Sequence, residues 1–259
     1  MLSYKDTYHR LLKLYKDTGA GHIGSGISIL PAIYVLLTQI FDAKKDILVF
    51  SKGHATAALY CVLFACDYIS EEELASFYSK DGTRFGGHVS SNLFDFIPFA
   101  TGSLGHGPSL ANGLALAKKY KKEPGLIYCI CGDGEWQEGA CWEALTFSVR
   151  HKLNNIVFYV DCNGWQGFGS VEDVTGYDEN VLVGKIQSFG AKVVQCNGES
   201  KDTLKSVFLA QSLDSFMPNV ILARTVKGKG LLEYENTLDS HYIQMSDNLY
   251  ERIMDNQRG

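Results

Sequence analysis

The hydrophobic and polar positions of the chain follow two alternating patterns. Runs that are apolar at nearly every position are typical of strands buried on both faces, and they lie at 46–50, 126–131, 155–160, 191–195 and 220–226. Between these runs, apolar residues recur at helical spacing, which predicts helices over 4–18, 27–41, 54–66, 108–119, 138–151, 179–189 and 201–212. The alternation predicts an α/β fold in which a parallel β-sheet is flanked by helices on both faces.

No internal repeat and no long linker interrupts this pattern, although the stretch from about 79 to 106 is rich in loop-forming residues. A chain of 259 residues suits one α/β domain with a sizeable core, so we expect a single domain over 1–259. Sheets of this kind bind ligands in the loops at the carboxyl ends of their strands. The chemistry of the protein is therefore expected there.

The most apolar stretch, 28–41, is interrupted by Pro31, Thr38 and Gln39, and we expect its helix to begin near Pro31. It is predicted to be too short and too broken to span a bilayer. The first 17 residues are charged and amphipathic, without the apolar run and cleavage site of a signal peptide. We therefore expect a cytoplasmic protein that does not engage a membrane.

Composition narrows the functional class further. The net charge is −5 and 46% of the residues are hydrophobic, which argues against a nucleic-acid partner and against a disordered chain. The seven cysteines never occur in a CxxC spacing, so they are interpreted as reduced core residues rather than as zinc ligands or disulfides. Cys129 and Cys131 alternate within an apolar run and should share one face of a buried strand.

The strongest chemical signal lies where two predicted strands end. The first strand is followed by Gly-Asp-Gly-Glu at 132–135, and the next strand along the chain ends in Asp-Cys-Asn-Gly at 161–164. If these strands are neighbours, Asp133 and Asn163 converge, and together with a loop carbonyl they supply three oxygen ligands of the kind that Mg²⁺ prefers. Gly132 and Gly134 leave room for a phosphate to approach backbone N–H groups. A simple turn after a strand is the alternative interpretation of the Gly-Asp-Gly sequence.

Other nucleotide and hydrolase sites fit poorly. The chain has no GxxxxGK[ST], no HExxH and no GxSxG, and its glycine clusters at 21–26 and 102–107 follow GxxGxG rather than GxGxxG. Hydrolase and dehydrogenase functions therefore lack their characteristic motifs.

Six ordered motifs from about residue 10 to 245 resemble the diphosphate-binding half of transketolases. They are GHIGSG, SKGHATAALY, TGSLGHG, GDGEWQEGACWEAL, HKLNNIVFYVDCNGWQ and RTVKGKG. The resemblance implies the thiamine-diphosphate-binding fold, with thiamine diphosphate and Mg²⁺ (or Ca²⁺ or Mn²⁺) as cofactors. It also implies transfer of a two-carbon ketol unit from a ketose, phosphorylated or not, to an aldose.

Five of the seven histidines lie in glycine-rich or polar loops, namely His22, His54, His88, His106 and His241. A neighbouring glycine offers an imidazole little to pack against, and imidazole can donate to phosphate and sugar oxygens. These five are therefore candidates for a binding site.

The resemblance assigns roles to particular positions. It implies catalytic roles for His22, His54, His88, His241 and Glu138; cofactor contacts for His54, Gly105, His106, Gly107, Asp133, Gly134, Glu135, Asn163 and His241; and Mg²⁺ ligation by Asp133, Asn163 and the carbonyl of Trp165. Glu138 matches an acid that links paired active sites, and capping of its own helix is the alternative.

Three positions depart from the family pattern. His88 is followed by Val-Ser-Ser where a proline and an acid are usual, His106 replaces a common glutamine, and His241 is followed by Tyr-Ile-Gln instead of small residues. In the transketolases that the chain resembles, these positions border the substrate channel, so we expect a donor or acceptor sugar outside the pentose-phosphate set.

The resemblance also implies that part of the catalytic machinery lies elsewhere. The glutamate that activates the cofactor, and the arginines that grip phosphate, belong to a pyrimidine-binding domain that nothing after residue 245 can form. We expect a partner subunit to carry it, in a heterotetramer with two copies of each chain. A truncated fragment and a catalytically silent regulatory subunit are the alternatives. A thiamine-dependent 2-oxoacid decarboxylase or dehydrogenase subunit is the rival enzyme, for which the histidines would be surplus.

Overall fold

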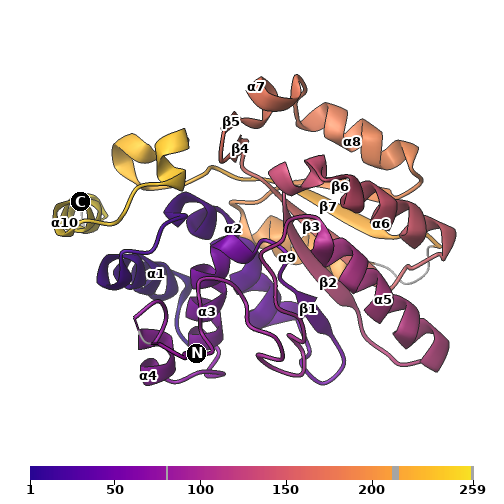
Figure 1. Cartoon of the computed structure of the whole chain (residues 1–259), viewed down its shortest axis with the longest axis horizontal. Helices are drawn as coiled ribbons and strands as arrows, with labels where there is room; N and C mark the ends of the chain where they lie inside the picture. Colours follow the sequence, from indigo (N-terminus) through magenta and orange to yellow (C-terminus); the bar gives the residue numbers. More distant parts are fainter. Residues whose placement is uncertain (80, 212–215, 258–259) are drawn as a thin grey trace.

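A five-stranded parallel sheet forms the centre of the protein (Figure 1). The structure is a computed structural model that describes residues 1–79, 81–211 and 216–257. The strands run in the order β1-β2-β3-β7-β6, and their bounds are β1 Ile47–Val49, β2 Ile127–Gly132, β3 Ile156–Cys162, β6 Lys192–Asn197 and β7 Asn219–Arg224. Each strand matches a predicted one to within a few residues.

Helices cover both faces of this sheet, as predicted (Figure 1). One face is covered by α2 Ile23–Val35 and α9 Lys201–Leu209, with α1 Tyr4–Thr18 and α3 Thr56–Ala65 packed against α2. The other face is covered by α5 His106–Lys121, α6 Gly139–Arg150 and α8 Glu179–Ser188. The expected α/β fold is therefore confirmed, while residue 212 of the predicted 201–212 helix lies outside the described residues.

Shorter elements complete the chain. They are α4 Glu71–Ala75, α7 Val171–Thr175, the amphipathic α10 Asp247–Asn256, the hairpin of β4 Trp165–Gln166 and β5 Gly169–Ser170, and the 3-10 turns Gly53–Ala55, Gly134–Gln137, Leu232–Tyr234 and Leu238–His241. The sequence patterns did not predict α10. It begins after Ser246, whose hydroxyl accepts a hydrogen bond from the N–H of Leu249 at 3.2 Å.

Five of the seven cysteines are buried and two, Cys66 and Cys196, are partly buried, and strand β2 shows how two of the buried ones pack. Cys129 and Cys131 lie on the same face with their sulfur atoms 3.7 Å apart, while Tyr128 and Ile130 pack into the core on the other face. All seven cysteines are free thiols. The predicted alternation is confirmed, because successive side chains of a strand point to opposite faces of the sheet.

Helix α2 differs from its prediction in where it begins. It starts at Ile23 rather than near Pro31, which lies inside it, and it continues as a π-helical turn over Leu36–Ile40. The glycines of the GHIGSG motif predicted a loop, but Gly24 and Gly26 lie within the helix and allow close packing against it. A Cβ atom on Gly24 would come within 2.9 Å of the Lys227 side chain.

The expectation that this segment is too short to span a bilayer was also wrong. Together the two helical parts form an 18-residue stretch, Ile23–Ile40, which is long and apolar enough to cross a membrane by length and composition alone. Of this stretch, 78% is buried inside the protein, beneath α1 and α3 and against the sheet. Burial of this kind is what the core helix of an α/β domain shows.

The register of the sheet brings the ends of three strands to one edge. Gly132 of β2 lies beside Asp161 of β3, which lies beside Ala223 of β7. The loops that follow these strands therefore begin next to one another, and the candidate site lies among them.

Candidate active site

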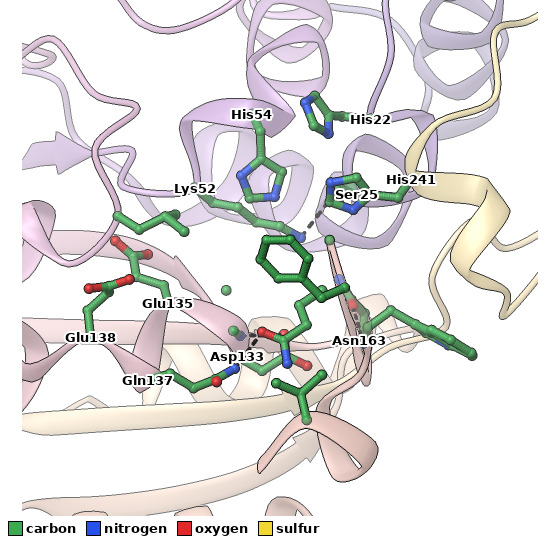
Figure 2. A pocket seen from close by; sticks show the side chains of 18 of the residues that line it. His22, Ser25, Lys52, His54, Asp133, Glu135, Gln137, Glu138, Asn163 and His241 are labelled. Carbon is green, nitrogen blue, oxygen red and sulfur yellow. Dashed lines mark hydrogen bonds between the residues drawn. The ribbon is translucent and has the colours of Figure 1, made fainter.

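A cavity of about 450 Å³ opens at this edge of the sheet (Figure 2). Among its lining residues are His22, His54, His88, Asp133, Asn163 and His241. Figure 2 shows His22, His54 and His241 on one side of the cavity, with Asp133 and Gln137 on the opposite side. Most of the predicted site residues thus meet at one place, although they come from segments far apart in the sequence.

The predicted metal ligands lie side by side because β2 and β3 are neighbours. The Asp133 carboxylate accepts one hydrogen bond from the N–H of Gly134 and one from the N–H of Gly164, both at 2.8 Å. The side-chain oxygen of Asn163 accepts a hydrogen bond from the N–H of Trp165 at 3.0 Å. These bonds join the loop after β2 to the loop after β3 and bring the oxygen ligands together.

The electrostatics of Asp133 favour a cation. Burial, and next the negative charge of Asp161, raise the pKa of Asp133 to about 6. Among the described residues, no cluster of three or more His, Cys, Asp or Glu side chains is arranged to hold a metal. The donor set is instead one carboxylate, one amide oxygen and one backbone carbonyl, which suits a Mg²⁺ ion that retains positions for phosphate and water.

Three histidines form a cluster opposite Asp133. The ring centroids of His22 and His241 are 4.7 Å apart, and those of His22 and His54 are 5.4 Å apart. Burial and then nearby positive charges lower the pKa of all three, that of His241 to about 3. The imidazoles are therefore neutral at physiological pH, so each has one N–H donor and one nitrogen acceptor.

Two buried lysines at the site lie within the sequence motifs, but the sequence alone assigned them no role. The Lys227 ammonium group donates to Nδ1 of His241 at 2.9 Å and to the carbonyl of Trp165 at 3.5 Å. Burial, and next the charge of Lys52, lower the pKa of Lys227 to about 8. Lys52 lines the cavity and pairs with Asp161. The only signal in the sequence was a lysine within an otherwise glycine-rich or apolar motif.

Glu135 holds the loop before α5 against the end of β2. Its buried carboxylate accepts hydrogen bonds from the hydroxyl of Ser51 and, at 2.9 Å, from the N–H of Gly105. Burial raises its pKa. Gly105 adopts φ 82°, and Gly107 packs so closely on Ser51 that a Cβ atom there would lie 3.2 Å from the Ser51 backbone. These two glycines therefore allow the loop before α5 to pack closely against Ser51 and Glu135.

The remaining predicted residues differ in their relation to the cavity. The His88 ring lines the cavity beside Gly53 and Gly102, where a Cβ atom on Gly102 would come within 2.8 Å of it. Glu138 lines the cavity as the N-cap residue of α6, without a capping hydrogen bond from its side chain. His106 is the first residue of α5 and is exposed, and it is not among the described residues that line the cavity.

Several features of the cavity fit a diphosphate with Mg²⁺. His22 Nδ1 and Gln166 Nε2 are buried and lack a hydrogen-bond partner within the described residues, although both side chains line the cavity. A Cβ atom on Gly134 would lie 3.2 Å from Gln166, so glycine keeps this approach open. Unsatisfied buried polar groups are costly, and a polar ligand would satisfy them.

Comparison with known proteins identifies the family. Residues 8–253 match the family model described as transketolase, thiamine diphosphate binding domain. The chain belongs to the transketolase family. The resemblance expected from the six motifs is thereby confirmed, and the protein is a transferase of the transketolase type.

Individual transketolases match over most of the chain. The 6-deoxy-6-sulfo-D-fructose transketolase subunit SqwG of Clostridium sp. (strain MSTE9) is 33% identical, with 90% of this chain and 86% of that protein aligned. An apulose-4-phosphate transketolase subunit of Phocaeicola vulgatus is 31% identical, with 95% and 89% aligned. The structure of transketolase from Leishmania mexicana matches 99% of this chain and 41% of its own, with a TM-score of 0.86 and 24% identity.

Proposed function

We propose that this protein is the N-terminal subunit of a split transketolase. It binds thiamine diphosphate and Mg²⁺ and, joined by a second subunit, transfers a two-carbon ketol unit from a ketose or ketose phosphate to an aldose. The observation that carries the proposal is the buried Asp133 carboxylate, which faces the cavity with only backbone N–H donors among the described residues. Because this carboxylate lines the cavity together with Asn163, it is placed to bind a cation there.

The need for a partner is supported by the lengths of the relatives. The two relatives named as subunits are covered to 86% and 89% of their length, whereas the chain spans 41% of the Leishmania transketolase. We infer that a second chain supplies the pyrimidine-binding domain and the activating glutamate. A heterotetramer with two copies of each subunit is the expected assembly.

In this proposal, Asp133, Asn163 and the carbonyl of Trp165 would hold Mg²⁺ beside the diphosphate of the cofactor. Lys227, which already donates to that carbonyl, would contribute positive charge beside the phosphates. When bound, thiamine diphosphate supplies the electron sink that carbon–carbon bond cleavage requires. The protein supplies binding and orientation.

The histidine cluster suits a polyhydroxylated substrate. Since the Lys227 ammonium group donates to Nδ1 of His241, the ring proton of neutral His241 lies on Nε2. His22 and His54 are held neutral by burial, so each can both donate and accept hydrogen bonds with sugar hydroxyls. The transketolase match and this cluster favour a sugar over a 2-oxoacid.

The sequence departures near His88 and His241 support a specialised sugar. The two subunit relatives are named for 6-deoxy-6-sulfo-D-fructose and for apulose-4-phosphate, and both names contain an anionic group, a sulfo group and a phosphate. No arginine occurs among the described residues that line the cavity. We therefore propose that the partner subunit binds the anionic end of the substrate, while this chain binds its hydroxyls.

The proposal is tested by calorimetric titration of thiamine diphosphate with Mg²⁺ into the chain alone and into its mixture with the proposed partner subunit. We expect tight binding in the mixture, and ketol transfer in the mixture but not with the chain alone. Asp133→Ala should weaken binding at least about 100-fold, because it removes the charged ligand.

Asp46→Ala is the matched control, because Asp46 is also a buried carboxylate that accepts only backbone N–H bonds within the described residues. It lies before β1, away from the cavity, so its substitution should leave cofactor affinity unchanged. Full activity of the chain alone would contradict the split-subunit proposal. Absence of binding in the mixture would support a silent regulatory subunit instead.

A further inference from the structure

A closed polar network lies directly beneath the proposed metal ligands. Asp161 of β3 is fully buried, and it accepts hydrogen bonds from four side chains that belong to four different segments. The donors are Ser28 of α2 at 2.6 Å, Asn163 at 3.3 Å, Lys52, and Thr225 after β7. The proposed function assigns no role to this carboxylate.

In every hydrogen bond that Asp161 makes with these four side chains, its carboxylate is the acceptor. An ionised carboxylate can only accept, so Asn163 must present its NH₂ group to Asp161, as the structure shows. The Ser28 hydroxyl gives its proton to Asp161, and its oxygen accepts from Asn163 at 3.3 Å. With its nitrogen held on the inner side, the Asn163 carboxamide turns its oxygen outward, toward Trp165 and the metal edge.

Lys52 balances the charge of the buried carboxylate. Its ammonium group is paired with Asp161 and also donates to the Ser25 carbonyl at 3.3 Å and the Ser28 hydroxyl at 3.2 Å. All three ammonium protons thus have acceptors. A buried charge persists only when it is paired and hydrogen-bonded, so Asp161 depends on the lysine of the SKGH motif, 109 positions away.

We propose that Asp161 is a positioning residue, which orients the carboxamide of Asn163 so that its oxygen faces the metal, and that Lys52 supplies the matching charge. The inference rests on the proposed function, in which Asn163 is a metal ligand. Groups that orient metal ligands in this way commonly change metal affinity by about 10- to 100-fold when they are removed.

The test compares the full chain with the double variant Lys52→Met/Asp161→Asn, which removes both charges together and so leaves no unpaired buried ion. Its first readout is hydrogen exchange of the Asn163 side-chain NH₂, measured by NMR and assigned as the signal lost in Asn163→Asp. We expect protected protons in the unmodified chain and exchange that is about tenfold faster or more in the double variant, because an amide at 161 no longer dictates one orientation.

The second readout is the affinity for Mg²⁺ in the presence of thiamine diphosphate and the partner subunit. We expect the dissociation constant to rise about tenfold or more in the double variant and to stay unchanged in Asp46→Asn, which removes a buried carboxylate charge elsewhere. Unchanged exchange in the double variant, or equal effects in Asp46→Asn, would overturn the proposal.

The two proposals fail in different ways. If the unmodified chain binds no cofactor with its partner, the proposed function fails, while the exchange readout still decides whether Asp161 orients Asn163. If the double variant does not fold, Ser28→Ala replaces it. That variant keeps both charges and removes one acceptor of the Asn163 NH₂ group, so it should show a smaller increase in exchange of the same signal.

Discussion

Two buried carboxylates at the same edge of the sheet have opposite surroundings. Asp161 is surrounded by four side-chain donors and is paired with Lys52. Asp133 accepts only backbone N–H groups within the described residues, and burial raises its pKa to about 6. The first carboxylate is fully satisfied within the protein, whereas the second retains unfavourable electrostatics that a cation would relieve.

The comparison separates two tasks that buried acids perform at one site. A satisfied carboxylate holds its neighbours in a defined geometry, because each donor would lose its partner if it moved. An unsatisfied carboxylate is ready to bind, because the ligand supplies the missing favourable interaction. The following substitutions test whether Asp161 and Asp133 behave in these two ways.

The largest effect is expected for Lys52→Met, which leaves Asp161 as an unpaired buried charge. We predict a loss of about 3–5 kcal/mol in the free energy of unfolding, measured by urea denaturation without cofactor. Lys227→Met is the matched control. Lys227 is also buried but forms no ion pair among the described residues, and burial lowers its pKa to about 8, so its loss should cost far less. Equal losses in the two variants would contradict the assigned role of the Lys52–Asp161 pair.

An effect of intermediate size is expected for Asp133→Asn, which should change how the free energy of unfolding depends on pH. A carboxyl group whose pKa rises on folding stabilises the protein below its unfolded pKa and loses that contribution as the pH rises through its folded pKa. The pKa rises from 3.8 to about 6. The metal-free wild type should therefore lose about 1.4 kcal/mol relative to Asp133→Asn between about pH 5 and pH 8.

This difference is measured by urea denaturation of both chains at several pH values in a chelating buffer. Mg²⁺ added with thiamine diphosphate and the partner should stabilise the wild type at the higher pH and not the variant. A stability difference that does not change with pH would show that Asp133 is satisfied without a cation.

The smallest effect is expected for His106→Ala at the exposed start of α5. Among the described residues, the ring forms one hydrogen bond, with the carbonyl of Leu104 at 3.3 Å. We predict a change of less than about 0.5 kcal/mol in the free energy of unfolding, measured by urea denaturation. A larger loss would show that His106 belongs to the buried network and is not merely exposed at the start of α5.

Much of the fold could be predicted from local patterns. The apolar runs located the five strands, and the alternation of Cys129 and Cys131 predicted which residues share a face. The beginning of α2 could not be predicted, because Gly24 and Gly26 resemble loop residues until the side chains that pack against them are known. The roles of Lys52 and Lys227 could not be predicted either, since a sequence does not show which lysines are buried.

The sequence by itself determined the layered α/β architecture, the placement of Asp133 and Asn163 at strand ends, and the family to which the chain belongs. These follow from spacing and residue type within short segments, since burial on both faces and sharp turns leave local signals. Only the tertiary structure decided that Asp161 is paired and Asp133 is not. That difference depends on Lys52 reaching across 109 positions, and such a contact depends on how the helices pack on the sheet.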